Sequence, residues 1–187
     1  MILPIYVYGQ PVLRQETEEL DQNYPNLKQL IADMFETMQQ ADGVGLAAPQ
    51  IGLSIRLVVI DLDVMGEDFP EYKGFRKAYI NPYIEEYDES KMDSMEEGCL
   101  SLPGIHEAVK RPTRIKVSYL DEDFNLHEEW VDGYLARVMQ HEFDHLDGKV
   151  FTDRISPLRR QMVKGKLTML LKGRVHASYK TKRVVKK

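Results

Sequence analysis

The feature that most constrains this chain is the run His141-Glu142-Phe143-Asp144-His145. Because an α-helix repeats about every 3.6 residues, two histidines four positions apart project from one face and can bind the same cation. In the His-Glu-x-x-His pattern, the glutamate after the first histidine is a general base beside a metal-bound water. The run therefore predicts a helix that carries part of a metal site.

The residues on either side also favour a helix through this run. Asp132 suits the position before the first turn, residues 134 to 146 contain no proline, and Gly148 suits the left-handed turn that ends a helix. Tyr134 and Val138 lie on the same face as the two histidines, so they are candidates to line a pocket. The plain alternative is an amphipathic surface helix that carries two unconnected histidines.

Two histidines leave a divalent metal short of ligands, and the single cysteine of the chain, Cys99, is the best further donor. A single cysteine is more often a small buried hydrophobic residue. Beside a histidine pair that needs a third ligand, however, coordination by the thiolate is favoured. One cysteine and two histidines leave a fourth position open for water, as in catalytic rather than structural metal sites.

Three motifs, in this order, resemble the signature motifs of the peptide deformylases. Residues 43–50 read Gly-Val-Gly-Leu-Ala-Ala-Pro-Gln, residues 97–101 read Glu-Gly-Cys-Leu-Ser, and residues 140–145 read Gln-His-Glu-Phe-Asp-His. The first is a run of small residues that lets the backbone approach a ligand closely. The likeness spans about residues 1–170.

The resemblance implies a reaction and roles for particular residues. Deformylases remove the formyl group from formyl-methionyl nascent polypeptides, releasing formate and a free N-terminal methionine. By this likeness the water bound to the metal is the nucleophile, and Glu142 is the general base and acid. The side-chain amide of Gln50 and the backbone N–H of Leu100 stabilise the negative charge that develops on the carbonyl oxygen.

The same resemblance places the peptide as an added strand between two backbone segments, with an apolar pocket for its first side chain. The candidate substrate-binding residues are Val44, Gly45, Glu97, Gly98, Tyr134 and Val138. For Glu97 a second interpretation stays open, that of a solvated acid paired with an arginine. His106 lies at the position where a charged group often meets the peptide further out.

The ligand types do not select one metal. A thiolate and two imidazoles satisfy Zn²⁺ and also accept Fe²⁺, Co²⁺ or Ni²⁺. The family resemblance implies Fe²⁺ in the cell, with Ni²⁺, Co²⁺ or Zn²⁺ able to substitute for it.

Hydrophobic periodicity predicts an α+β fold. Apolar residues at helical spacing between Pro25 and Gly43 indicate an N-terminal helix, and strands are expected at 55–60, 77–84, 114–120 and 126–131. Pro82 would interrupt the second strand, and residues 64–76 would form an inserted loop. We expect mixed, mostly antiparallel sheets around the central metal-binding helix, with a further helix near the C-terminus.

Charge divides the chain into two parts. Residues 151–187 hold twelve Lys or Arg and one acid, Asp153, a net charge of +11. Because the family resemblance ends near residue 170, we expect a catalytic domain at 1–170 and a basic C-terminal tail at 171–187. In the plain interpretation this region is a solvated helix, docked through Leu158, Met162, Leu167 and Leu170, with a frayed end. The alternative is that the cationic tail contacts ribosomal phosphate.

Other features concern the compartment in which the chain works. No run of residues approaches the ~20 apolar positions that cross a bilayer, and the first residues lack the pattern of a secretion signal. We therefore expect a cytoplasmic protein without membrane contact, in which Cys99 stays reduced.

Two other classes of protein also fit part of the sequence. A zinc endopeptidase would share His141, Glu142 and His145 but take a third ligand downstream, where Asp153 and His176 are the candidates. A non-enzymatic module could bind the metal at a structural site that stabilises its fold, and bind RNA through its basic tail. Such a module would need neither Glu142 nor Gln50.

Overall fold

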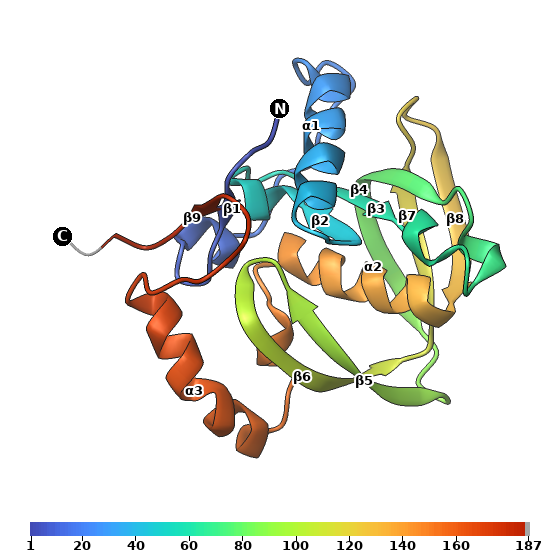
Figure 1. The fold of residues 1–187 in the computed structure, drawn as a ribbon. Helices are drawn as coiled ribbons and strands as arrows, with labels where there is room; N and C mark the ends of the chain where they lie inside the picture. The colour runs from blue at the N-terminus through green and yellow to red at the C-terminus, as the bar shows by residue number, and fades with distance from the viewer. Residues whose placement is uncertain (186–187) are drawn as a thin grey trace.

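Residues 1–185, the part of the chain that this computed structural model describes, form three helices around mostly antiparallel sheets (Figure 1). The helices are α1 (Leu27–Gln40), α2 (Gly133–Leu146) and α3 (Pro157–Leu171). The strands are β1 (Ile5–Tyr6), β2 (Gly45–Ala47), β3 (Leu57–Asp61), β4 (Arg76–Tyr87), β5 (Met92–Cys99), β6 (Leu102–Pro112), β7 (Arg114–Leu120), β8 (Leu126–Asp132) and β9 (Thr181–Lys182).

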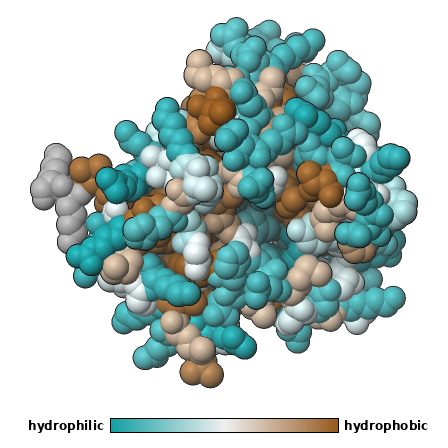
Figure 2. Space-filling view, viewed as in Figure 1, coloured by the Kyte–Doolittle hydropathy of each residue, from teal (hydrophilic) through white to brown (hydrophobic). Residues whose placement is uncertain are grey.

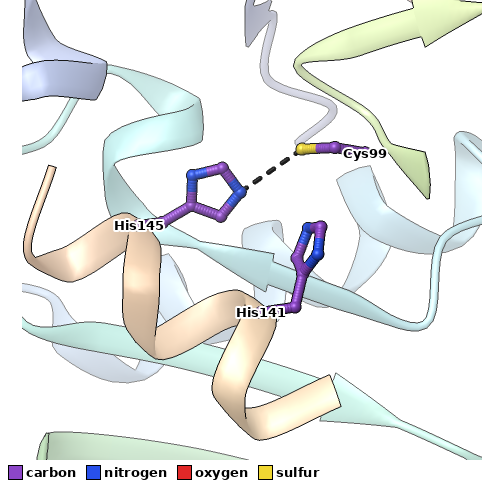
Figure 3. A group of neighbouring side chains, drawn as sticks. All are labelled: Cys99, His141 and His145. Carbon is purple, nitrogen blue, oxygen red and sulfur yellow. Dashed lines mark hydrogen bonds between the residues drawn. The ribbon is translucent and has the colours of Figure 1, made fainter. Parts of the chain in front are cut away.

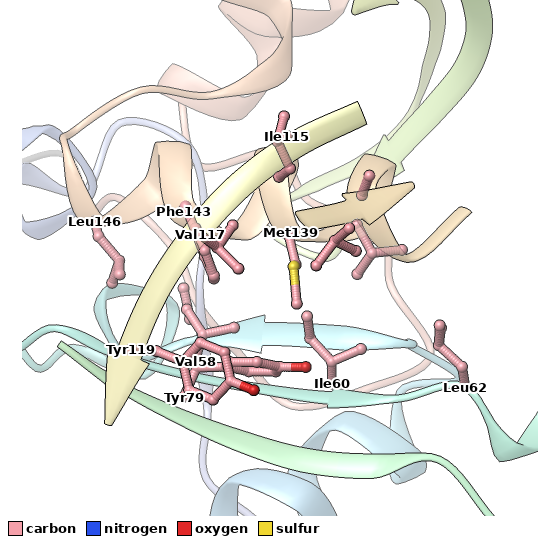
Figure 4. Close-up of a cluster of buried hydrophobic side chains, with 14 residues drawn as sticks. Val58, Ile60, Leu62, Tyr79, Ile115, Val117, Tyr119, Met139, Phe143 and Leu146 are labelled. Carbon is pink, nitrogen blue, oxygen red and sulfur yellow. The ribbon is translucent and has the colours of Figure 1, made fainter. Parts of the chain in front are cut away.

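The largest sheet has the strand order β2-β3-β4-β7-β8, and all of its neighbouring strands are antiparallel. Helix α2 packs across one face of this sheet because its apolar side meets the inward side chains of β3, β4 and β7. Met139 and Phe143 of α2 lie with Val58, Ile60 and Tyr79 in this core (Figure 4). The other face of the sheet packs against α1.

Strands β5 and β6 form a separate antiparallel hairpin on the opposite side of α2 (Figure 1). Alternate residues of β6, including Ile105 and Val109, join a third core with Val163 and Leu167 of α3. Helix α2 is therefore enclosed between the large sheet and the hairpin. A polar side chain on α2 can reach either one without crossing solvent.

The predicted α+β class is confirmed, and so is the central position of the helix that carries His141 and His145. Strand β7 has the predicted bounds, and β3, β4 and β8 differ from the predictions by a few residues at their ends. Pro82 coincides with a register shift between Ile80 and Tyr83, as its missing N–H predicts. The region 64–76 connects β3 to β4 and contains two short 3₁₀ turns.

Helix α3 docks through fewer residues than expected. Leu167 and Leu170 are buried, but Leu158 and Met162 are 73% and 65% exposed, so their predicted docking is wrong. Val163 joins Leu167 and Leu170 on the buried side instead, because a helix that contacts the core along one edge buries a narrow stripe. Leu158 and Met162 therefore remain on the surface.

The segment after α3 returns to the body of the protein. Gly173, with φ 73°, ends the helix, and β9 then pairs in parallel with β1. Hydrophilic side chains cover most of the face seen in Figure 2, with hydrophobic residues in small separate groups. None of the helices in residues 1–185 is both long enough and apolar enough to span a bilayer.

Candidate active site

Helix α2 positions the two histidines and the glutamate of the central motif. Asp132 precedes the helix and Gly148, with φ 72°, follows it, as the sequence predicts. His141, Glu142 and His145 are all buried, because α2 is enclosed between the large sheet and the β5–β6 hairpin (Figure 1). The rings of the two histidines lie 5.3 Å apart on one face of the helix.

The third potential metal donor comes from the end of β5. Cys99 Sγ lies 3.3 Å from Nε2 of His145 (Figure 3). One donor atom from each of Cys99, His141 and His145 falls within 4.8 Å of the others. A thiolate and two imidazoles that converge in this way fit a divalent transition metal.

His141 is oriented by a carboxylate behind it. Its Nδ1 is 2.8 Å from Oε1 of Glu97, so Nε2 is the nitrogen left to face Cys99 and His145. Such a hydrogen bond selects the tautomer and fixes the ring plane of a metal-binding histidine. Nδ1 of His145 is buried without a partner among residues 1–185.

Glu97 belongs to a buried ionic network, not to the solvent. It accepts hydrogen bonds from Arg111 at 2.7 and 2.9 Å and from Arg137 at 2.8 Å. Arg111 also reaches Asp144, 3.0 Å away. Burial raises the pKa of Glu97, but the hydrogen bonds from His141 and Arg111 outweigh it and hold the pKa well below its usual value. The idea of a solvated acid is therefore wrong, although the pairing with arginine is correct.

The other members of this network, Arg111, Arg137 and Asp144, were not predicted as site residues from the sequence. Arg137 precedes His141 by four residues and so lies on the same face of α2, which is the one signal that could have found it. Arg111 and Asp144 carry no comparable signal, because their pairing depends on how the hairpin packs against the helix.

Glu142 lies beside the three donors with one oxygen free. Its Oε1 is 4.0 Å from Nε2 of His141, and its Oε2 is buried without a hydrogen-bond partner among residues 1–185. Burial raises the pKa of Glu142 to about 7. A carboxylate with this pKa can take up and release a proton near neutral pH.

The amide of Gln50 is held so that its nitrogen points into the site. Its Oε1 accepts a hydrogen bond from the backbone N–H of Ala47 at 2.9 Å. Its Nε2 then donates to Ser101 Oγ at 3.2 Å and lies 3.5 Å from Cys99 Sγ. This buried N–H donor faces the same space as the metal donors.

A cleft of about 540 Å³ opens over these groups. Ten of the residues that line it were expected at a deformylase-like site: Val44, Gly45, Gln50, Gly98, Cys99, Leu100, His106, Tyr134, His141 and Glu142. A side pocket of about 100 Å³ adjoins the cleft and is lined by Val44, Tyr134 and Val138, with Glu97 and Arg137 beside them. The structure thus brings the predicted substrate-binding residues to one place.

The downstream donors that an endopeptidase would need lie elsewhere. Asp153 is paired with Arg14 at 2.5 Å, and His176 lies on the wall of the cleft outside the donor cluster. Three converging donors, an open cleft and a buried carboxylate with one free oxygen define a metal-dependent hydrolase.

Comparison with known proteins identifies the kind of hydrolase. A model of the polypeptide deformylase family matches residues 2–161. The chain therefore belongs to the polypeptide deformylase family, whose members are metal-dependent enzymes that remove the formyl group from the N-terminus of new polypeptides.

Relatives and solved structures agree with this assignment. Peptide deformylases of Flavobacterium psychrophilum and Cytophaga hutchinsonii are 45% and 44% identical to the chain, each over 100% of both sequences. The peptide deformylase of Thermus thermophilus superposes with a TM-score of 0.80 at 40% identity, covering 91% of this chain and 98% of that one. The peptide deformylase of Synechococcus elongatus, solved with actinonin, gives a TM-score of 0.78 at 39% identity and covers 88% and 87%.

Proposed function

We propose that this chain hydrolyses the formyl group of formyl-methionyl peptides with Cys99, His141 and His145 as metal ligands and Glu142 as general base and acid. The observation that carries the proposal is the convergence of the three donor atoms within 4.8 Å beside the unpaired carboxylate oxygen of Glu142. A structural metal site would need no such carboxylate. The products are formate and a peptide with a free N-terminal methionine.

The proton transfers fall to Glu142. A divalent cation held by Cys99, His141 and His145 would polarise the formyl carbonyl and lower the pKa of a water molecule bound to it. Glu142 takes the proton from the attacking water as the C–O bond forms. It returns that proton to the amide nitrogen as the C–N bond breaks, because the amine leaves readily only when protonated. Its raised pKa, about 7, suits both steps.

Gln50 and Leu100 stabilise the charge that develops on the carbonyl oxygen. The Ala47 N–H fixes the amide of Gln50 so that Nε2 is the atom presented to the cleft, and the backbone N–H of Leu100 follows the metal ligand directly. Donors that are in place before the reaction need no reorganisation. The loss of one such donor typically lowers the rate by about 10² to 10³.

The peptide binds between two free strand edges. Strand β2 is the first strand of its sheet and β5 pairs only with β6 within residues 1–185, so Val44–Gly45 and Glu97–Gly98 offer backbone groups on both sides of the cleft. Backbone pairing accepts many sequences. The side pocket takes the methionine side chain, with Val44, Tyr134 and Val138 as its apolar lining.

We propose Fe²⁺ as the metal in the cell, with Ni²⁺, Co²⁺ or Zn²⁺ as substitutes. The choice of Fe²⁺ rests on the family resemblance, because the donor set itself accepts all four ions. A ferrous ion held by a thiolate is open to oxidation at both iron and sulfur. We expect the Fe²⁺ form to lose activity in air while the Ni²⁺ form keeps it. Equal lifetimes of the two forms would contradict this.

Formate release tests the function. The chain is purified without oxygen, loaded with Ni²⁺ and incubated with formyl-Met-Ala-Ser, alongside Glu142→Gln and the exposed control Glu122→Gln. We expect turnover in the wild type and in Glu122→Gln. Glu142→Gln should bind the metal but release no formate above background. Absence of turnover in the folded, metal-loaded wild type would reject the function.

We also propose that residues 1–170 form the catalytic domain, that residues 171–187 are a basic segment joined to it, and that the enzyme works in the cytoplasm. Residues 186 and 187 of this segment lie outside the described part of the chain. The test of location is fractionation of the cells that make the protein. The reduced thiol that Cys99 needs favours the cytoplasm over an oxidising compartment.

Contact with the ribosome is proposed for the basic C-terminal region. In the tail at 171–187 the cations Lys172, Arg174 and Lys180 are exposed, which suits contact with ribosomal phosphate. Reversing the charges of Lys172 and Lys180 should reduce co-sedimentation with ribosomes at low salt. The same change at Lys28 and Lys91, which are exposed elsewhere, should have no effect.

A further inference from the structure

The segment that follows α3 forms one wall of the active-site cleft. His176, Ala177, Ser178 and Tyr179 line the cleft together with the residues of the three motifs. The segment is held there by backbone pairing of β9 with β1, through Ile5 N–H to Lys180 C=O at 2.9 Å and Val7 N–H to Lys182 C=O at 3.0 Å. The basic segment is therefore part of the surface that surrounds the substrate.

One side chain of this wall contacts the turn that carries the catalytic groups. The hydroxyl of Tyr179 donates a hydrogen bond to the backbone carbonyl of Leu100 at 2.7 Å. Burial raises the pKa of Tyr179 to about 12, and the nearby Cys99 adds to the shift. The hydroxyl thus keeps its proton at neutral pH and acts as a donor.

The turn at residues 99–102 departs from the regular hairpin. Gly98 pairs with His106, but the next pair is Cys99 with Leu102, so the ladder shifts register at this point. Residues 100 and 101 project from the end of the hairpin, and partners outside the hairpin must hold their backbone groups in place.

Within residues 1–185, three hydrogen bonds from outside the hairpin are made to residues 100 and 101 of this turn. Tyr8 N–H donates to the carbonyl of Ser101 at 2.8 Å, Gln50 Nε2 donates to Ser101 Oγ at 3.2 Å, and Tyr179 donates to the carbonyl of Leu100. The side chain of Leu100 packs separately against the core around α1. The hydrogen bond from Tyr179 is the one made to the backbone of Leu100, the residue whose N–H is proposed to stabilise the reacting oxygen.

We propose that Tyr179 is a positioning residue for the deformylation reaction. Its hydrogen bond holds the turn in the orientation that presents Cys99 Sγ to the metal and the Leu100 N–H to the carbonyl oxygen. The proposal rests on the proposed function. It gives the C-terminal segment a role in the chemistry that is separate from any contact with the ribosome.

A purely structural role for Tyr179 makes a different prediction. The segment is already tied to β1 by backbone hydrogen bonds that do not involve the tyrosine hydroxyl. Removing that hydroxyl therefore leaves the segment in place and frees only the turn. A positioning role changes kcat more than KM, whereas simple anchoring of the segment changes neither.

The test compares Tyr179→Phe with Tyr83→Phe in the metal-loaded protein. Tyr83 also donates one hydrogen bond of 2.7 Å, to Glu19, but it is exposed and does not line the cleft, so it is a matched control. The measurements are kcat and KM for formate release from formyl-Met-Ala-Ser in the Ni²⁺ form, and hydrogen exchange of the Leu100 amide by NMR in the diamagnetic Zn²⁺ form.

For Tyr179→Phe we expect kcat to fall about threefold to tenfold, the effect of one lost hydrogen bond, with KM changed less than twofold. The Leu100 amide should exchange faster by a similar factor. Tyr83→Phe should leave both quantities unchanged.

Several results would overturn the proposal. One is a folded Tyr179→Phe protein with wild-type kcat, whether or not Leu100 exchange changes. Another is an equal loss of kcat in Tyr83→Phe, which would show a general effect of stability. If the wild type releases no formate, the proposed function is rejected, and this result says nothing about Tyr179. The positioning role is then tested by exchange alone, and it is rejected if the Leu100 amide exchanges at the same rate in Tyr179→Phe as in the wild type.

Discussion

Gly45 is the position where a single methyl group should disturb the general base directly. A Cβ built on Gly45 lies 2.7 Å from Oε1, 2.8 Å from Cγ and 2.9 Å from Cδ of Glu142, whereas ordinary contacts begin at 3.4 Å. Glu142 is buried and packed, so its carboxylate has to move as a unit. In Gly45→Ala the shift from 2.7 to 3.4 Å displaces the base by about 0.7 Å.

The size of the effect follows from that displacement. A misplacement of about 1 Å can lower an enzymatic rate about 10²-fold, so we expect kcat to fall about 10- to 100-fold, or about 1.4 to 2.7 kcal/mol of transition-state stabilisation. The free energy of unfolding should change little. Alanine restricts the backbone of the unfolded chain, which stabilises the folded protein by about 0.4–1 kcal/mol and offsets part of the steric strain in the folded state.

The assay is steady-state formate release together with thermal unfolding and metal content. Gly165→Ala is the control, because the added Cβ meets no atom within 4 Å and the residue lies in the exposed face of α3. It should keep wild-type kcat and gain about 0.5–1 kcal/mol of stability, since alanine favours a helix over glycine. Wild-type kcat in Gly45→Ala, within twofold, would refute the argument.

Three further predictions concern the network, the core and the surface. Glu97→Gln should weaken metal binding about 10- to 100-fold, measured by competition with a chelator, because the residue that orients a metal-binding histidine is altered. Tyr79→Phe should raise the free energy of unfolding in urea by about 1 kcal/mol, because the Tyr79 hydroxyl is buried without a partner among residues 1–185. Burial raises the pKa of Asp153, but the hydrogen bond from Arg14 outweighs it, so the pKa lies below the usual 3.8. The ionised carboxylate of Asp153 therefore stabilises the fold at pH values above 3.8. This contribution to the free energy of unfolding is lost as the pH falls through the lowered pKa. The difference in melting temperature between wild type and Asp153→Asn should be largest near pH 6 and vanish near pH 2; a constant difference would contradict this.

The parts of the site that depend on short spacing could be predicted from the sequence. His141 and His145 share a helix face at any tertiary arrangement, and the small residues around Gly45 admit a close backbone approach wherever they lie. Strands β3 and β7 were also predicted, because their apolar residues are continuous or alternate within a few neighbouring positions.

Other parts depend on contacts that one sequence does not reveal. Strand β5 buries one residue of eight, Glu97, and β6 buries the charged Glu107 and Arg111 among its apolar residues, so neither strand carries a clean hydrophobic pattern. The contacts of Arg111 with Asp144 and of Arg137 with Glu97 arise only when the hairpin folds over α2. Strand β2 has three residues and is too short for periodicity to detect.

The pairing of β1 with β9 links the order of synthesis to the time at which the enzyme becomes active. Strand β1 leaves the ribosome early, but its partner lies at residues 181–182, so the two strands can meet only after almost the whole described chain has emerged. A contact of such long sequence separation also forms slowly, because a large loop must close first. The cleft wall at residues 176–179 is therefore among the last parts of the molecule to assemble. We expect a nascent copy of this enzyme to gain full activity only after β9 has left the ribosome and paired with β1.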